Sequence, residues 1–237
     1  MTPARAWRLC VAAGVVAFLC SWGFGRIPGL TACGPSGGLG PIIALEFARS
    51  PADVAALFGV DPCRSTLVAA QRTALWLDAL GFIPAYTAFL VLAALASGVR
   101  DKRPTLSHRS SRTVALWLST TFLVAGLADE VEGVVLHRIL AALPGTQALL
   151  DALWWPVHIK FALLGLGTLG IAVQLLASRR IGGLIATLPV GLGALTALAG
   201  LAHMPTPVMM TGFTIAWVSL LLTAIAGAVR PSLFAAP

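Results

Sequence analysis

The sequence predicts an all-α, polytopic integral membrane protein: a bundle of six transmembrane helices with both termini in the cytoplasm. Of its 237 residues, 58% are hydrophobic and only 11% are charged, whereas a soluble domain carries about 25% charged residues to cover its surface. The mean hydropathy is +0.90. Apolar runs also recur along the chain, each close to the ~20 residues that a helix needs to cross the hydrocarbon.

Six apolar runs are long enough to span a bilayer. They are Trp7 to Gly25, Leu75 to Ser97, Val114 to His137, Pro156 to Ala177, Gly183 to Leu201 and Pro207 to Val229. We treat residues 1–237 as a single membrane domain with one long outer loop over residues 26–74. The first run could instead be a signal peptide, but the aromatic residues Trp22 and Phe24 fit a cleavage site poorly, which favours an uncleaved helix.

The distribution of basic residues predicts the orientation. With the N-terminus inside, ten of the sixteen basic residues face the cytoplasm: Arg5, Arg8, Arg100, Lys102, Arg103, Arg109, Arg112, Arg179, Arg180 and Arg230. This excess of Lys and Arg indicates the cytoplasmic side, and we expect the inner (plasma) membrane of a bacterium. Because the basic residues form short clusters between apolar runs, and not one polar face, no nucleic-acid partner is expected.

The long outer loop carries signals for a short amphipathic helix. Residues 34–41 are rich in Gly and Pro and predict turns. Ser50 is then placed to cap a helix, with Pro51 at its first position and Asp53 in its first turn. This helix should end at Phe58, before Gly59, and lie on the membrane surface or over the bundle.

The four cysteines predict one disulfide. Cys10 and Cys20 lie on the first helix roughly 15 Å apart along its axis, too far to bridge. Cys33 and Cys63 flank the outer loop, in a compartment where disulfides persist, and we expect them to pair.

No cofactor or metal site is predicted. The segment Gly165 to Gly170 matches the nucleotide-binding pattern G-x-G-x-x-G, but it lies inside an apolar span with no preceding strand. Its glycines are better explained by close helix contact. The histidines lie at helix ends, where an interfacial hydrogen bond is a simpler role than metal ligation.

Ionisable residues of three predicted spans converge near the outer face. Asp78 should lie one turn below the outer interface, and Asp129 and Glu132 share a face of the third span. His158 and Lys160 should lie in the first turn of the fourth. Because a charge buried in the bilayer costs at least ~2.5 kcal/mol, we expect Lys160 to pair with Asp129 or Glu132 in one pocket with Asp78.

Four carboxyls, those of Asp78, Asp129, Glu130 and Glu132, are nearly balanced only if the interfacial Arg72 and Arg138 join Lys160. If they extend to water instead, carboxyl groups are left over, and these must hold protons or bind a cation. Glu130 is the exception among the acids, because it is as well explained by exposure to the outer water.

Four short motifs resemble a pattern found in a family of small, uncharacterised bacterial multi-pass membrane proteins. They are Ala44-Leu45-Glu46-Phe47-Ala48, Trp76-Leu77-Asp78-Ala79-Leu80-Gly81-Phe82 with Tyr86, Ala125-Gly126-Leu127-Ala128-Asp129 with Glu132, and Ile159-Lys160-Phe161. The resemblance covers about the first 175 residues and implies no activity. It adds Glu46 to the pocket candidates Asp78, Asp129, Glu132, His158 and Lys160.

Three functions follow from this pocket. The first is binding or transport of a small molecule or lipid, or a relay of protons. The second is an enzyme acting on a lipid or isoprenoid, with Asp129 or Glu132 as general acid and Lys160 or His158 as its partner. The third is a structural or assembly subunit in which the ion pairs only join helices. The cytoplasmic half shows no polar side chains at matching depths, which disfavours transport. The oligomeric state is left open.

Overall fold

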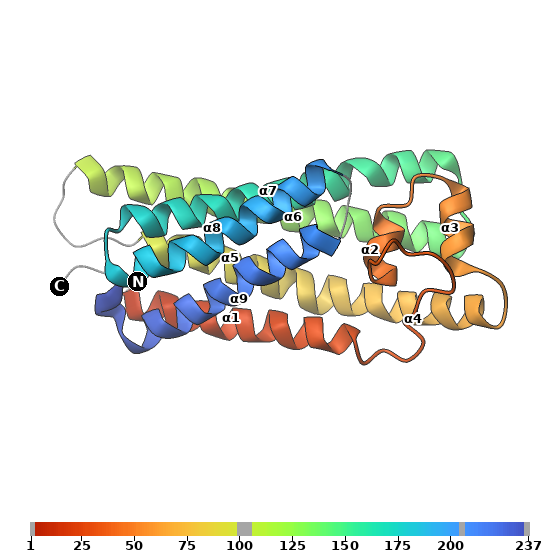
Figure 1. Cartoon of the computed structure of the whole chain (residues 1–237), viewed down its shortest axis with the longest axis horizontal. Coiled ribbons are helices and arrows are strands. Elements are labelled where there is room, and N and C mark those ends of the chain that lie inside the picture. The colour runs from red at the N-terminus through yellow and green to blue at the C-terminus, as the bar shows by residue number, and fades with distance from the viewer. Residues whose placement is uncertain (1–2, 99–105, 204–206, 235–237) are drawn as a thin grey trace.

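The computed structural model describes residues 3–98, 106–203 and 207–234 and is an all-α bundle (Figure 1). Its elements are α1 (Pro3–Phe24), α2 (Pro41–Glu46), α3 (Pro51–Phe58), α4 (Cys63–Leu77), the π-helical turn η1 (Asp78–Phe82), α5 (Ile83–Gly98), α6 (Leu106–Ala141), α7 (Gln147–Ala177), α8 (Ile181–Ala202), α9 (Pro207–Val229) and the 3₁₀ turn η2 (Pro231–Leu233). With α4, η1 and α5 counted as one continuous helix, six helices are long and apolar enough to cross a membrane. The chain is therefore a multi-pass membrane protein.

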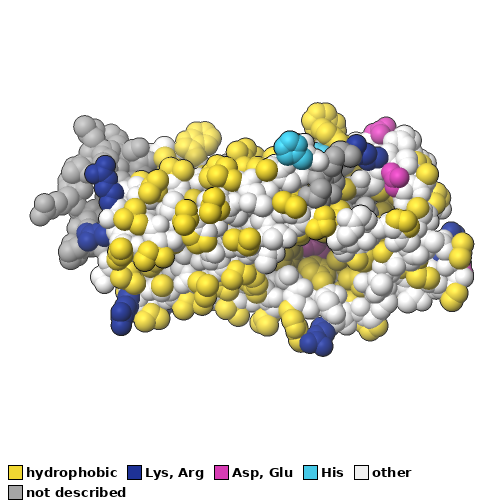
Figure 2. All heavy atoms as spheres, in the orientation of Figure 1, with side chains coloured by type: hydrophobic (Ala, Val, Ile, Leu, Met, Phe, Trp, Pro, Cys, Tyr) yellow, Lys and Arg dark blue, Asp and Glu magenta, His cyan; other side chains and the backbone are white. Residues whose placement is uncertain are grey.

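The spanning helices form a closed ring. Each packs on the next along the chain, from α1 on α5 through α6, α7 and α8 to α9, and α9 packs back on α1. The start of α1 and the end of α9 lie at the same end of the bundle (Figure 1). Apolar side chains cover its flank, and Lys and Arg side chains gather at that end (Figure 2). The predicted inner loop that holds Arg100, Lys102 and Arg103 lies outside the described residues.

Glycines bring neighbouring helices into close contact. A Cβ atom on Gly193 of α8 would lie 2.6 Å from the backbone nitrogen of Ala216 in α9. In the nucleotide-like segment of α7, a Cβ on Gly165 would lie 2.5 Å from Leu198 of α8, and one on Gly167 would lie 2.6 Å from Phe122 of α6. The prediction that these glycines serve helix packing is confirmed.

Three helices extend beyond the predicted apolar runs, at the end of the bundle opposite the start of α1 (Figure 1). The second span begins at Cys63 and not near residue 75, α6 ends at Ala141, and α7 begins at Gln147 and not at Pro156. The continuous helix from Cys63 to Gly98 has 36 residues, whose length of ~54 Å exceeds the ~30 Å hydrocarbon core. Its outer turns therefore project from the membrane, where polar side chains are favourable and hydropathy carries no signal.

The extension of α7 changes the position of Lys160. Thr146 caps this helix by accepting a hydrogen bond at its hydroxyl from the backbone N–H of Leu149 (3.3 Å), and Pro156 lies inside the helix. The expectation that His158 and Lys160 lie in the first turn is therefore wrong. Both lie more than two turns below the start of α7.

The predicted amphipathic helix of the outer loop is confirmed as α3. Ser50 and Asp53 form a capping box, and the helix ends before Gly59, whose φ is 57°. Hydrogen bonds from the backbone N–H groups of Arg49 and Ser50 hold the pKa of the Asp53 carboxyl below its usual range. The buried side chains of α3, among them Leu57 and Phe58, face the bundle.

The predicted disulfide is also confirmed. Cys33 and Cys63 are bonded, with their Cα atoms 5.9 Å apart. The bond closes a loop that contains α3 and a second short helix, α2, which the sequence did not predict. Together with the outer half of α4, these two helices form what we call the outer cap (Figure 1).

Candidate functional site

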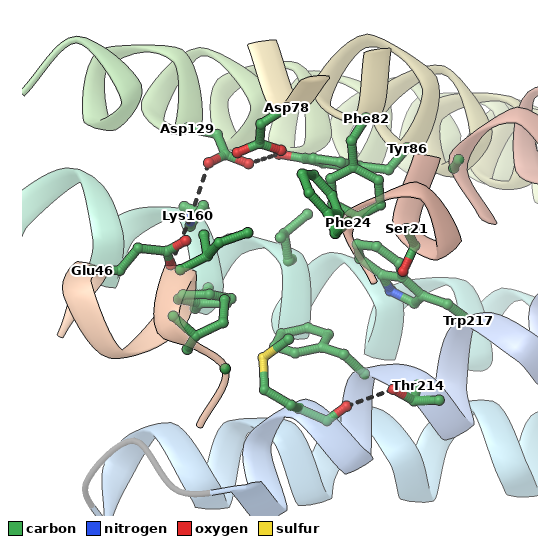
Figure 3. A pocket seen from close by; sticks show the side chains of 18 of the residues that line it. Ser21, Phe24, Glu46, Asp78, Phe82, Tyr86, Asp129, Lys160, Thr214 and Trp217 are labelled. Atoms are coloured by element: carbon green, nitrogen blue, oxygen red, sulfur yellow. Dashed lines mark hydrogen bonds and ion pairs between the residues drawn. The ribbon is translucent and has the colours of Figure 1, made fainter. Parts of the chain in front are cut away.

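A buried ion cluster lies beneath the outer cap, with Lys160 of α7 at its centre (Figure 3). The Lys160 Nζ atom donates to Glu46 Oε2 (3.1 Å) and to Asp129 Oδ1 (2.9 Å). It also donates to Glu132 Oε1 (2.8 Å), whose Oε2 lies 2.7 Å away. The exposed fractions of these four residues are 1% to 5%. An ammonium group has three N–H donors, so this cluster uses all of them.

Local helix geometry explains most of this convergence. Asp129 and Glu132 are three positions apart on α6 and therefore point the same way. Glu46 is the last residue of α2, and the outer cap holds it over α7. Burial raises the pKa of the Glu46 carboxyl, against the opposing effect of the nearby Lys160 ammonium.

Asp78 and Tyr86 extend the cluster toward α5. The Tyr86 hydroxyl donates a hydrogen bond to Asp129 Oδ2 (2.7 Å). Asp78 is the first residue of η1, where the N–H of Ile83 donates to the Asp78 carbonyl five positions earlier. Such π-helical turns are often found at functional sites. No hydrogen bond or ion pair reaches the Asp78 carboxyl from any other residue in the described part of the chain.

The cluster adjoins a cavity of about 450 Å³ lined by residues of α1, α2, η1, α5, α6, α7 and α9. One end is polar and holds Glu46, Asp78, Asp129, Lys160 and the Tyr86 hydroxyl. The rest of the wall is mainly apolar, with aromatic rings from Phe18, Phe24, Phe82, Phe161, Phe213 and Trp217. Figure 2 shows acidic atoms at the bottom of a hollow on the flank of the molecule.

Aromatic rings form a continuous row beside the acids. Ring centroids are 5.7 Å apart for Phe24 and Phe82, 5.2 Å for Phe82 and Tyr86, and 5.5 Å for Tyr86 and Trp217. The Lys160 ammonium itself lies 4.6 Å from the ring centroid of Phe161. The wall can therefore receive both an apolar chain and a positive charge.

The two arginines that could have balanced the charges do not reach the cluster. Arg72 donates to the backbone carbonyl of Leu140 (3.3 Å), Arg138 is exposed, and neither lines the cavity. Among the described residues, Lys160 is the one Lys or Arg side chain in the cavity wall, against the three carboxyls of Glu46, Asp78 and Asp129, with Glu132 behind them.

His158 is the one pocket candidate that the structure does not bring to the cluster. Its Nδ1 lies 2.7 Å from the carbonyl oxygen of Trp154, and its ring stacks on Trp154 with a centroid distance of 4.1 Å. Residues two positions apart point about 200° away from each other around a helix, so His158 cannot share the direction of Lys160. Glu130, also outside the cavity wall, is partly exposed as expected.

The sequence analysis missed the hydrogen bond of Tyr86 and the aromatic wall. Tyr86 is the single tyrosine of the chain, and it follows Asp78 and Phe82 at intervals of four, which places all three on one side of a helix. That spacing was the available signal. Trp217 had none, because its place in the wall depends on the return of α9 to α1.

Buried polar side chains are also present in the other half of the bundle. Ser97 of α5 and Gln174 of α7 share a hydrogen bond of 2.6 Å, which corrects the expectation that no polar residues lie there. Ser97 and Gln174 are both uncharged, and the hydrogen bond joins their side chains to each other. Within the described ranges, no three His, Cys, Asp or Glu side chains are arranged to hold a metal ion.

The fold and the site define a class of protein: a multi-pass helical membrane protein with a buried ion cluster at one end of an aromatic cavity. No family model, curated protein or solved structure matches the chain. The family resemblance seen in the sequence therefore stays a prediction, and the function has to be argued from the geometry of the site.

Proposed function

We propose that this chain is a bacterial inner-membrane protein that binds a small amphiphilic molecule from the outer leaflet. The observation that carries the proposal is the cavity of about 450 Å³, which joins an aromatic wall to a buried ionisable end. Ligand pockets are typically concave, mostly apolar and supplied with a few convergent polar groups.

The outer placement of the cavity rests on two arguments. Basic residues concentrate at the end of the bundle away from the cavity, and an excess of Lys and Arg is typical of the cytoplasmic end of a membrane protein. The disulfide of the outer cap is also stable in an oxidising compartment such as the periplasm.

A lateral entrance between α1 and α9 supports uptake from the lipid. The two helices touch closely where Gly14 of α1 meets Leu221 of α9, since a Cβ on Gly14 would lie 2.9 Å from that side chain. Nearer the outer end they diverge around the cavity, where Ser21 and Thr214 are exposed residues of its lining. Trp22, the residue after Ser21 on α1, is 61% exposed, as expected of a side chain at the level of the lipid head groups.

Binding can be tested with photoactivatable single-chain lipids in nanodiscs, with crosslinks mapped by peptide mass spectrometry. Crosslinks should fall on the cavity segments of α1, η1 and α9. Thr214→Trp, which fills the entrance, should reduce their yield by about tenfold, whereas Thr211→Trp, at an exposed position of α9 outside the cavity lining, should not. The pair is matched, because each threonine hydroxyl bonds a carbonyl of its own helix at 2.9 Å. Equal yields in both variants would refute binding in this cavity.

A second candidate is an enzyme that acts on a lipid or isoprenoid. It is favoured by the continuous chain of ionisable groups from Tyr86 through Asp129 and Lys160 to Glu132, since such groups can exchange protons with a bound molecule. Mass spectrometry of the bound lipid separates the two functions: a binding protein returns it unchanged, whereas an enzyme returns a product.

A further inference from the structure

Resting on the proposed function, we infer the class of ligand: an amphiphile with one alkyl chain and an ammonium head group. Its head group would lie against the Asp78 carboxyl and the aromatic rings beside it, and its chain would fill the apolar part of the cavity. Three observations carry this inference. The Asp78 carboxyl has no hydrogen-bond donor among the described residues, and the Lys160 ammonium already uses its three donors. Aromatic rings line the wall beside these groups.

Asp78 is the acid available to a ligand. The ammonium of Lys160 already donates to Glu46, Asp129 and Glu132, and so has no donor left for a fourth carboxyl. Asp129 is further occupied by the Tyr86 hydroxyl. Asp78 lines the same cavity, and within the described residues its carboxyl has no hydrogen-bond donor. Asp78 is half-buried, and a ligand N–H group would give its carboxyl the donor that it lacks.

The charge around Asp78 selects the sign of the head group. With all groups ionised, the carboxyls of Glu46, Asp78, Asp129 and Glu132 face a single ammonium. A phosphate or carboxylate head group would add a further negative charge to this excess. A neutral hydroxyl would leave the excess in place. An ammonium reduces it and can donate to Asp78 at the same time.

The aromatic row provides a second contact for a cation. Figure 3 shows Asp78 and Asp129 next to the side chains of Phe82 and Tyr86, with Phe24 and Trp217 further along the same wall. Positive charges are attracted to the faces of such rings. The same cavity wall already holds one example, because the Lys160 ammonium lies 4.6 Å from the centroid of the Phe161 ring.

The cavity also limits the ligand's apolar part. A volume of about 450 Å³ lies in the lower part of the range of small-molecule pockets, roughly 300 to 1,000 Å³. It suits one chain better than the two chains of a phospholipid. Ser21 and Thr214 are exposed residues of the cavity lining on α1 and α9, so a chain that passes between them would enter from the membrane without crossing water.

Competition in nanodiscs tests this inference. A photoactivatable alkylammonium lipid is crosslinked to the full chain, and unlabelled dodecylammonium, dodecanol, dodecanoate or ethylammonium is added as competitor. Dodecylammonium should compete at least about tenfold better than dodecanol, because a hydrogen bond to a charged group strengthens binding by about this factor. Dodecanoate should be the weakest competitor of the three dodecyl compounds. Ethylammonium, which has the head group without the chain, should compete weakly. These comparisons need no variant, so they stand even if a substitution prevents folding.

Two matched variants then locate the head group. Asp78→Asn should abolish the preference for dodecylammonium over dodecanol, whereas Glu130→Gln, which removes a carboxyl outside the cavity wall, should keep it. If all three dodecyl compounds compete equally in the wild type, the ammonium inference is overturned. The binding function still stands in that case, provided that Thr214→Trp blocks the crosslinks. An unchanged preference in Asp78→Asn, or strong competition by ethylammonium, would also overturn it. Absence of any cavity crosslink would overturn both proposals.

Discussion

Lys160 and Glu46 lie 114 positions apart in the sequence, yet their charged atoms are 3.1 Å apart. Their contact joins the outer cap to α7 at the polar end of the cavity. Because Glu46 is the last residue of a six-residue helix, its position depends on the cap that surrounds it. The cap is therefore part of the site and not only a connection between two spans.

Replacing Lys160 by Met should strongly destabilise the fold. Removing one partner from a buried ion cluster typically costs about 3 to 5 kcal/mol, because the remaining charges are left unpaired. The carboxyls of Glu46, Asp129 and Glu132 can then be neutralised only by protons, so the folded variant binds more protons than its unfolded chain. Its stability should consequently rise as the pH falls. Unfolding in mixed micelles at neutral and acidic pH measures both effects, with Arg138→Met as the exposed control.

The double variant Lys160→Met with Glu132→Gln separates a structural cluster from a functional one. Removing a carboxyl together with its cation should recover part of the lost free energy of unfolding. If the ion cluster is purely structural, ligand crosslinking to the double variant should recover together with its stability. If the cluster is functional, the variant should fold but crosslink less ligand than the wild type, because the described cavity wall has lost its one ammonium group.

Tyr86→Phe should cost about 1 to 3 kcal/mol, the price of leaving a buried acceptor without its donor. The aromatic ring is kept, so the loss reports the 2.7 Å hydrogen bond to Asp129. Ser119→Ala is the control, because that buried hydroxyl donates to a carbonyl of its own helix (2.8 Å). Chemical unfolding of the two variants should therefore differ, and equal losses would contradict a special role for Tyr86.

Removing the Cys33–Cys63 disulfide should destabilise the outer cap. The bonded cysteines are separated by 30 positions, for which the chain-entropy relation predicts roughly 3 to 4 kcal/mol. Thermal unfolding with and without reductant measures the effect, and Cys20→Ser, which removes a free thiol, is the control. Reductant should also lower ligand crosslinking, because the released loop carries Glu46. An unfolding temperature indifferent to reductant would contradict the prediction.

The orientation predicts opposite compartments for two loops. A reporter fused at Arg180, between α7 and α8, should be active in the cytoplasm, and one fused at Asp61, between α3 and α4, should be active in the periplasm. The reverse pattern would place the cavity on the cytoplasmic side and contradict uptake from the outer leaflet.

The sequence alone determined the features that depend on single segments. Apolar runs identified six spans, since each helix must bury its own backbone polar groups in lipid. The capping residues Ser50 and Asp53 predicted where α3 begins because capping is local. Helix rise placed Asp78, Asp129 and Lys160 near one depth, and three-residue spacing put Glu132 beside Asp129.

Only the tertiary structure decided what depends on how helices rotate and meet. It brought Glu46 of the outer cap to Lys160, turned His158 away and left Arg72 on a backbone carbonyl. The apolar runs did not predict the extensions of α4, α6 and α7, because hydropathy reports only the part of a helix that lies in lipid. The cavity itself was unpredictable, since its walls come from segments as distant as α1 and α9, whose approach is set by packing and not by any local pattern.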